Sequence, residues 1–127
     1  MKVSIGSKFI DGPYGGGNLF VKNLSKYLLD NNVDVVYDLN DIDIDIILIV
    51  NPLKNSEMST FNHLDAYYYK QYINKESIIL QRINECDERK NTNNVNSQIM
   101  NANQYADYTI YVSQWISDLF IQKGLNN

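Results

Sequence analysis

The sequence predicts an α/β fold, a doubly wound, mostly parallel sheet of about five strands with helices on both faces, as in Rossmann-like domains. Short runs of β-branched and apolar residues alternate along the chain with segments whose apolar residues recur at helical spacing. A helix between two consecutive strands makes those strands parallel, and such crossovers are almost always right-handed. The 127 residues have the length of one domain, and no repeat or linker interrupts the alternation.

Segments rich in Val, Ile, Tyr or Thr are predicted as strands, because these side chains suit a pleated, half-buried surface. In chain order they are residues 3–6, 33–37, 46–50, 77–83 and 109–112. The third strand is expected to end at Asn51 and Pro52, since proline has no amide hydrogen to donate to a sheet.

Helical spacing of apolar residues predicts a first helix after a glycine-rich loop, with Asn18 as its N-cap. This helix is expected to end near Asn31 and Asn32, because asparagine tolerates left-handed backbone. Ser113 is expected to cap the last helix and Gly124 to end it. The later helices are predicted over residues 64–72, 95–106 and 113–124.

Composition and charge exclude several classes of protein. The formal net charge is −4, whereas non-specific nucleic-acid binding needs clustered Lys and Arg, so no nucleic-acid partner is expected. A lone cysteine, Cys86, excludes a disulfide framework and is expected to pack inside the protein. The longest apolar run, residues 46–50, is far shorter than the ~20 residues that cross a bilayer. Since no signal peptide is recognisable, a cytoplasmic protein without a transmembrane segment is expected.

Two polar loops are expected to meet at one edge of the sheet. In open α/β sheets, ligands bind beyond the carboxyl ends of the strands, where the strand order reverses. For a strand order of 3-2-1-4-5, this point lies between the first and fourth strands. The glycine-rich loop, residues 12–18, follows the first strand, and residues 84–90 follow the fourth. The topology therefore predicts that both loops line a single crevice.

The glycine-rich loop suits an oxygen-rich ligand. Gly15, Gly16 and Gly17 carry no Cβ, so a ligand can approach their amides, and the following helix directs its positive end to the same place. A phosphate or a sugar hydroxyl fits such a loop. The spacing is neither G-x-G-x-x-G nor that of a P-loop, so neither nucleotide fingerprint is predicted. The alternative is a flexible turn.

The second loop is a dense polar cluster at the end of the fourth strand. It reads Arg82-Ile83-Asn84-Glu85-Cys86-Asp87-Glu88-Arg89-Lys90. Its cations, carboxylates and amide can bind hydroxyls or supply acid–base groups. The alternative is a charged segment that only faces solvent.

Three segments together carry a family resemblance. They are Gly12-Pro13-Tyr14-Gly15-Gly16-Gly17-Asn18-Leu19-Phe20, the Arg82-to-Lys90 segment and Tyr111-Val112-Ser113-Gln114-Trp115-Ile116. In content and order they resemble the N-terminal domain of GT-B-fold glycosyltransferases of the family-4-like group. The Arg82-to-Lys90 segment is similar to an arginine-asparagine-acid-cysteine-aspartate segment of that group. The segment from Tyr111 to Ile116 is similar to the group's valine-serine-acid-tryptophan segment, which connects a strand to a helix.

The resemblance implies transfer of a sugar from a nucleotide-sugar donor to an acceptor hydroxyl, usually with retention of configuration. Residues implied to approach the donor diphosphate are Gly15, Gly16, Gly17 and Asn18. Residues implied to lie on the acceptor side of the cleft are Arg82, Asn84, Asp87 and Arg89. No metal or other cofactor and no particular catalytic residue is implied.

A donor-binding second domain is absent from the 127 residues. The resemblance therefore implies that this acceptor-side domain works with such a domain in cis or in trans. The alternative is a non-catalytic module that binds a sugar or a phosphate.

Other polar and aromatic clusters are interpreted as structural. Asp41, Asp43 and Asp45 form overlapping D-x-D triplets, but they precede the third strand, away from the crevice, and are expected to face solvent. His63 has no metal-ligand spacing around it and is expected at the surface. The tyrosines of residues 67–72 are expected to pack on a helix with their hydroxyls in water; an acceptor platform or a domain contact is the alternative.

Overall fold

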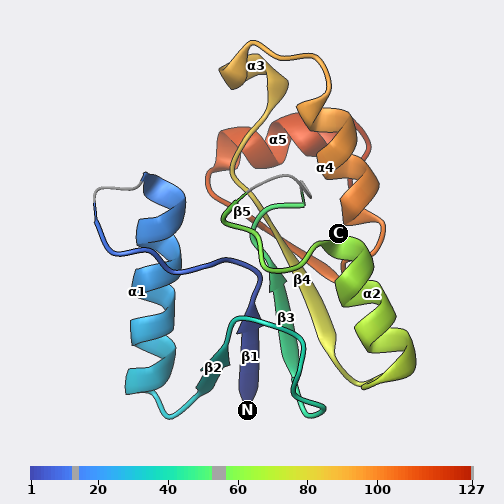
Figure 1. Cartoon of the computed structure of the whole chain (residues 1–127). Helices are drawn as coiled ribbons and strands as arrows, with labels where there is room; N and C mark the ends of the chain where they lie inside the picture. The colour runs from blue at the N-terminus through green and yellow to red at the C-terminus, as the bar shows by residue number, and fades with distance from the viewer. Residues whose placement is uncertain (13–14, 53–56, 127) are drawn as a thin grey trace.

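A computed structural model describes residues 1–12, 15–52 and 57–126 and shows a five-stranded sheet in which every pairing is parallel (Figure 1). The strands are β1 (Lys2–Ile5), β2 (Asp34–Val36), β3 (Ile46–Ile49), β4 (Ile78–Ile83) and β5 (Tyr108–Tyr111). The helices are α1 (Gly16–Asp30), α2 (His63–Tyr72), α3 (Asp87–Lys90), α4 (Val95–Asn103) and α5 (Gln114–Gln122). The predicted α/β class and its parallel strands are confirmed, while the short α3 stands where only a loop was predicted.

The predicted strand order 3-2-1-4-5 is wrong, because the strands lie in the order β2-β1-β3-β4-β5. β3 takes a central place, with Val3 paired to Ile46. Ile47, Leu48 and Ile49 are all buried, whereas the residues of β2 are exposed or half-buried. The more apolar strand thus lies where both of its faces are covered, and the less apolar strand lies at the edge. The strand order therefore reverses between β1 and β3.

The helices pack on both faces of the sheet (Figure 1). On one face, Val21 of α1 packs with Val3 and Leu48. On the other face, α2 packs around Ile79, and α4 and α5 pack around Ile83, which points to the same side of β4. Over β5, the face that carries α1 is open, so Tyr108 and Ile110 are exposed. Among the described residues, no helix combines the length and apolar character that crossing a bilayer requires.

The ends of two helices confirm their predicted signals. Ser113 Oγ accepts the backbone amide of Ile116 at the start of α5, and Gly124, with a φ of 107°, follows the end of this helix. Asn32, with a φ of 59°, follows the end of α1. The left-handed backbone at both positions stops the helix as the sequence predicted.

Asn18, in contrast, is not an N-cap. α1 begins at Gly16, with Gly15 in the capping position, so Asn18 falls inside the first turn. Its side chain instead holds the backbone of Ile10, accepting the amide at 3.1 Å and donating to the carbonyl at 2.6 Å. The prediction failed because the glycines join the helix and leave its first turn without a side-chain cap.

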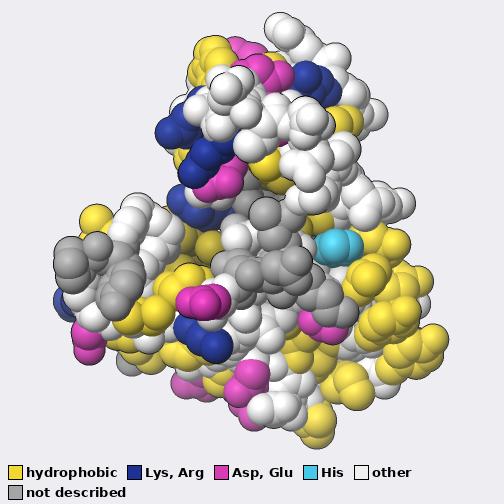
Figure 2. Space-filling model, turned by 45° about the horizontal axis from the view of Figure 1, so that its top comes forward, with side chains coloured by type: hydrophobic (Ala, Val, Ile, Leu, Met, Phe, Trp, Pro, Cys, Tyr) yellow, Lys and Arg dark blue, Asp and Glu magenta, His cyan; other side chains and the backbone are white. Residues whose placement is uncertain are grey.

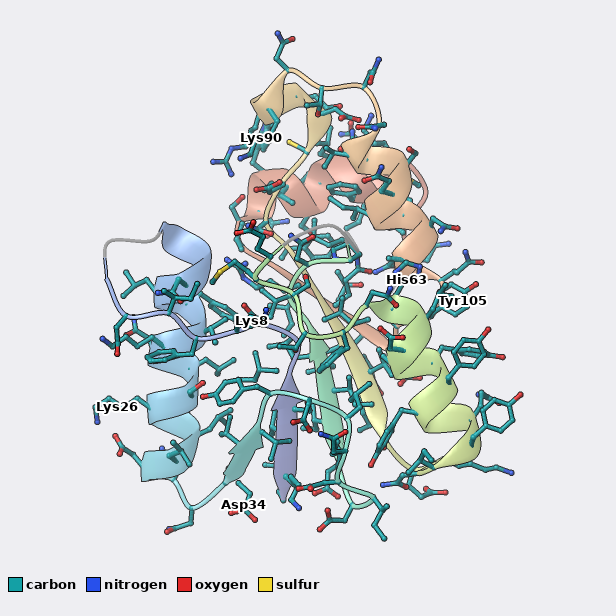
Figure 3. The ribbon with its side chains drawn as sticks, viewed as in Figure 1. Lys8, Lys26, Asp34, His63, Lys90 and Tyr105 are labelled. Atoms are coloured by element: carbon teal, nitrogen blue, oxygen red, sulfur yellow. The ribbon has the colours of Figure 1, made fainter. Side chains whose placement is uncertain are left out.

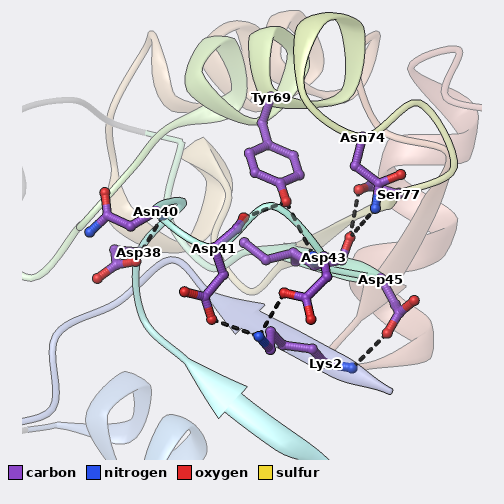
Figure 4. Close-up of polar contacts among 10 residues, drawn as sticks. Lys2, Asp38, Asn40, Asp41, Asp43, Asp45, Tyr69, Asn74 and Ser77 are labelled. Carbon is purple, nitrogen blue, oxygen red and sulfur yellow. Dashed lines mark hydrogen bonds and ion pairs between the residues drawn. The ribbon is translucent and has the colours of Figure 1, made fainter.

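The Asp-rich segment lies at the amino end of β3, as predicted, but its carboxylates do more than face solvent (Figure 4). Lys2 Nζ pairs with Asp41 at 2.7 Å and with Asp43 at 2.6 Å, and the Lys2 amide donates to Asp45 at 2.7 Å. Hydrogen bonds to the two carboxylates raise the pKa of Lys2, and the bond from Lys2 lowers the pKa of Asp43. The segment therefore fastens the start of β1 to the start of β3.

Three further predictions meet mixed outcomes. Cys86 is fully buried beside Ile83, which confirms its packing role. His63 is half-buried rather than on the open surface, because its ring lies 5.5 Å from that of Tyr105 (Figure 3). Burial lowers the pKa of His63. Tyr69 packs on its helix as predicted, but its hydroxyl donates to the Asp41 carbonyl at 2.6 Å instead of meeting water.

Candidate functional site

A cavity of about 560 Å³ opens at the carboxyl end of the sheet. One wall is formed by Gly15, Gly16, Gly17 and Asn18. A second wall is formed by Arg82, Asn84, Glu85, Arg89 and Lys90. The loop after β3 contributes Asn51, Pro52, Met58 and Ser59. The two loops that the sequence predicted to meet therefore line one cavity, although β3 separates β1 from β4.

The glycine wall presents the uncapped start of α1. Gly15, in the capping position, has no side chain, and no side-chain hydrogen bond caps this helix. A Cβ added to Gly15, Gly16 or Gly17 would meet nothing within 4 Å among the described atoms. Within the described part of the chain, the first amides and the positive end of this 15-residue helix thus border an open space.

Asn18 lines the cavity, but its side chain is already engaged. Both ends of its amide group bond the backbone of Ile10, as described above. This pair holds the loop before α1 against the first turn of the helix. Asn18 therefore shapes the glycine wall with its side-chain amide rather than presenting that amide to the cavity.

Arg82 is the most buried charged side chain of the second wall, with 9% of its surface exposed. It points to the α1 side of β4, where its Cζ atom lies 4.1 Å from the centre of the Phe20 ring. Its Nε atom is buried and has no hydrogen-bond partner among the described residues. Burial lowers the pKa of this guanidinium, while the charge of Glu85 opposes that shift. A desolvated cation that lies over an aromatic ring thus lines the cavity, and none of the described carboxylates is bonded to it.

The remaining charges of the second wall are more exposed. Arg89 Nη1 donates to the carbonyl of Asn84 over 3.4 Å, and Lys90 pairs with Glu85 at 3.2 Å. Three cations and one carboxylate therefore line this wall, although the whole chain is acidic. Figure 2 shows Lys and Arg side chains gathered where the α3 region faces α1, and Figure 3 labels Lys90, the last residue of α3. The local excess of positive charge suits an anionic ligand.

Asp87 was predicted on the acceptor side of the cleft, but it is not among the residues that line the cavity. Its carboxylate accepts the amides of Val95 at 2.9 Å and Asn96 at 3.1 Å, and also the hydroxyl of Thr92. The bond from Thr92, followed by those from backbone amides, lowers the pKa of Asp87. The side chain joins α3 to the start of α4 and so positions the second wall.

Sequence reasoning missed two parts of the site. Phe20 was included in the first segment of the family resemblance but given no role in the site, yet the centre of its ring lies 4.1 Å from the Cζ atom of Arg82. The loop after β3 was used only to end a strand, yet Asn51 and Ser59 border the cavity, with Ser59 Oγ 3.2 Å from the Asn51 carbonyl. The correct strand order would have identified this loop, because it follows a strand beside the point of reversal.

Within the described ranges, no group of three or more His, Cys, Asp or Glu side chains is arranged to hold a metal ion. No protein-family model matches the sequence, and a search of curated proteins finds no match either.

Proposed function

We propose that this chain is the acceptor-side half of a GT-B glycosyltransferase, which transfers a sugar from a nucleotide-sugar donor to an acceptor hydroxyl. One observation carries the proposal: the glycine loop before α1 and the polar segment after β4 line the same cavity. These are also two of the three segments that resemble the family. The donor-binding domain would act in cis or in trans, and the reaction would need no metal.

The two walls of the cavity would bind different substrates, the donor and the acceptor. The amides of Gly15, Gly16 and Gly17 would receive oxygens of the donor diphosphate, whose charge grows as the sugar leaves. Arg82, Asn84 and Arg89 would hold the acceptor with hydrogen-bond donors, and Asp87 would act by positioning their segment. Fixed donors of this kind stabilise developing charge without reorganising during the reaction.

A second candidate is a module that binds a sugar or a phosphate without chemistry. It is favoured by the state of Glu85, the carboxylate among the described residues of the cavity wall, which is paired with Lys90 at 3.2 Å. A general base needs a carboxylate free to accept a proton. A domain with cations and amides but no free base can bind a phosphorylated sugar and leave it unchanged.

Assays of transfer and binding separate the two candidates. The full product of the gene that encodes this chain would be incubated with nucleotide sugars and a panel of glycosyl acceptors, and mass spectrometry would detect transfer. The chain alone would be tested in parallel by calorimetry with the same nucleotide sugars. Transfer by the full product supports the glycosyltransferase, and tight binding without transfer in either sample supports the module. If neither sample transfers or binds, both candidates are wrong.

A further inference from the structure

We infer that Arg82 and the first turn of α1 form a single subsite for a phosphate group, with Phe20 as the residue that positions the guanidinium. The inference deepens the proposed function, and it rests on that function for identifying the ligand as a sugar phosphate or a nucleotide sugar. It also changes the division of the walls given above, because Arg82, assigned there to the acceptor, would share one phosphate with the glycine wall.

The first observation is the contact between the walls. Phe20 belongs to α1, close to the uncapped amides of Gly16 and Gly17, and its ring lies 4.1 Å from Arg82 Cζ. The guanidinium therefore lies beside the beginning of the helix, and both line the same cavity. The cavity that brings a ligand to the helix amides is therefore also lined by Arg82.

The second observation is the unmet bonding capacity of Arg82. Its side chain is nine-tenths buried, its Nε–H has no partner, and no ion pair joins it to an acid in the described part of the chain. A buried cation without a partner destabilises a protein, because its lost hydration is not replaced. Stacking on Phe20 replaces part of that hydration and holds the planar group in one orientation.

The guanidinium of Arg82 and the amides at the start of α1 both suit a phosphate group. A guanidinium offers parallel N–H groups that match two oxygens of one phosphate, and the amides of a helix start can receive a third. The cations Arg89 and Lys90 line the same cavity, and the carboxylate of Glu85 is held by Lys90. A neutral sugar would leave the Arg82 charge uncompensated.

Two sources could supply this phosphate, the diphosphate of a nucleotide sugar or a phosphate ester on the acceptor. Calorimetric titration of the chain would use UDP-glucose and pyrophosphate for the first source, and glucose 6-phosphate and inorganic phosphate for the second. Glucose would be the neutral control. We expect the probes of one source to bind at least about tenfold more tightly than glucose, and those probes identify the source.

The decisive variant is Arg82→Gln, with Lys22→Gln as a matched loss of one positive charge on α1 outside the cavity lining. We expect Arg82→Gln to weaken the phosphate-bearing probes about tenfold or more and to leave glucose unaffected, while Lys22→Gln binds as the unmodified chain does. Arg82→Met would show that the fold survives. Because it removes a buried unpaired charge, its melting temperature without ligand should equal or exceed that of the unmodified chain.

Phe20→Leu tests the positioning role. It should weaken the same probes severalfold while Arg82 is present and have no further effect in the Arg82→Gln background. The inference is overturned if Arg82→Gln binds phosphate-bearing probes as tightly as the unmodified chain, or if the unmodified chain binds none of them better than glucose. Sugar transfer by the full gene product that is insensitive to Arg82→Gln would remove the subsite and keep the proposed function. Phosphate binding through Arg82 without any sugar transfer would keep the subsite and remove the proposed glycosyltransferase function.

Discussion

Two cations at opposite ends of the sheet show how differently this molecule uses its charges. Lys2, at the amino end, pairs with Asp41 at 2.7 Å and with Asp43 at 2.6 Å (Figure 4). Arg82, at the carboxyl end, is more buried, yet its Nε has no partner among the described residues. The better-solvated cation is thus the one that receives two carboxylates.

The neighbours of each cation extend the contrast. At the amino end, the Ile44 carbonyl accepts Ser77 Oγ at 2.6 Å and Asn74 Nδ2 at 3.1 Å, so polar groups there satisfy one another. At the carboxyl end, α1 begins without a side-chain cap beside a cavity. At the amino end the polar groups therefore bond one another, whereas at the carboxyl end Arg82 Nε and the first amides of α1 have no side-chain partner among the described residues.

The largest effect on phosphate binding is expected when an acidic side chain is placed at the carboxyl end of the sheet. Gly16→Asp has room for its side chain, because a Cβ there meets no atom of the described residues within 4 Å. Like charges about 4 Å apart repel by about 4 kcal/mol near a protein surface, so phosphate-probe affinity should fall about a hundredfold or more. Stability should hold or rise by roughly 0.3–1 kcal/mol, since an acid suits the start of a helix. Calorimetry and urea unfolding measure the two effects.

Gly16→Ser is the matched control, because it adds a side chain of similar reach without charge. It should retain most of the affinity for the phosphate probe. If the serine and aspartate variants bind equally well, the start of α1 does not contact the ligand.

The next effect concerns Asp87, whose carboxylate joins α3 to α4. Asp87→Ala should lower the urea midpoint, because the amides of Val95 and Asn96 lose their acceptor. Affinity for the phosphate probe should fall by less than about tenfold, since the second wall loses a support but no ligand contact. Asp118→Ala, which removes a carboxylate bonded to Gln114, is the control and should change neither quantity much. A variant with full stability but no binding would instead give Asp87 a direct role.

A smaller effect is expected at the amino end. Lys2→Met should lower the urea midpoint and leave phosphate binding unchanged, because Asp41 and Asp43 lose their shared cation far from the cavity. The loss should shrink in 1 M salt, which screens exposed ion pairs. Should Lys2→Met raise stability, as is expected of Arg82→Met, the contrast between the two ends would be lost.

The smallest expected effect is a pH dependence of stability that arises from the carboxyl group of Glu88. Its side chain accepts Asn96 Nδ2 at 3.0 Å and pairs with Lys123 at 3.0 Å. The bond from Asn96, a bond from its own backbone amide and the bond from Lys123 together lower its pKa from 4.5 to about 2. A carboxyl whose pKa falls on folding stabilises the fold above its unfolded pKa, and this contribution is lost as pH falls toward the folded value. The difference in urea midpoint between the unmodified chain and Glu88→Gln should therefore shrink between about pH 4.5 and 2. A constant difference across this window would contradict the assigned pKa.

Strand positions and most helix ends were predictable because they depend on local signals. β-Branched runs such as residues 46–50 identify a strand without reference to the rest of the chain. The order of the strands was missed, although the uninterrupted apolar run of residues 46–50 is typical of a strand covered on both faces and therefore of a central place in the sheet. The prediction of Asn18 as an N-cap was wrong because its side chain bonds the nearby backbone of Ile10 instead.

The site was predictable only in part. The glycine loop was identified because it follows β1, and Arg82 was identified because it lies at the carboxyl end of β4. The stacking of Phe20 on Arg82 joins α1 to β4 and depends on how the helix lies on the sheet. No spacing along the chain records such a contact, so neither the missing partner of Arg82 nor the shared subsite could be inferred before the fold was known.

One measurement tests the central claim, that the two loops form a single ligand site. Nitrogen–proton correlation spectra of the ¹⁵N-labelled chain would be followed during titration with glucose 1-phosphate. If one site holds the phosphate, the amide signals of Gly16 and Gly17 and the Nε–H signal of Arg82 shift together and give one Kd. Signals that move on only one wall, or two walls that titrate with different Kd values, would contradict this claim.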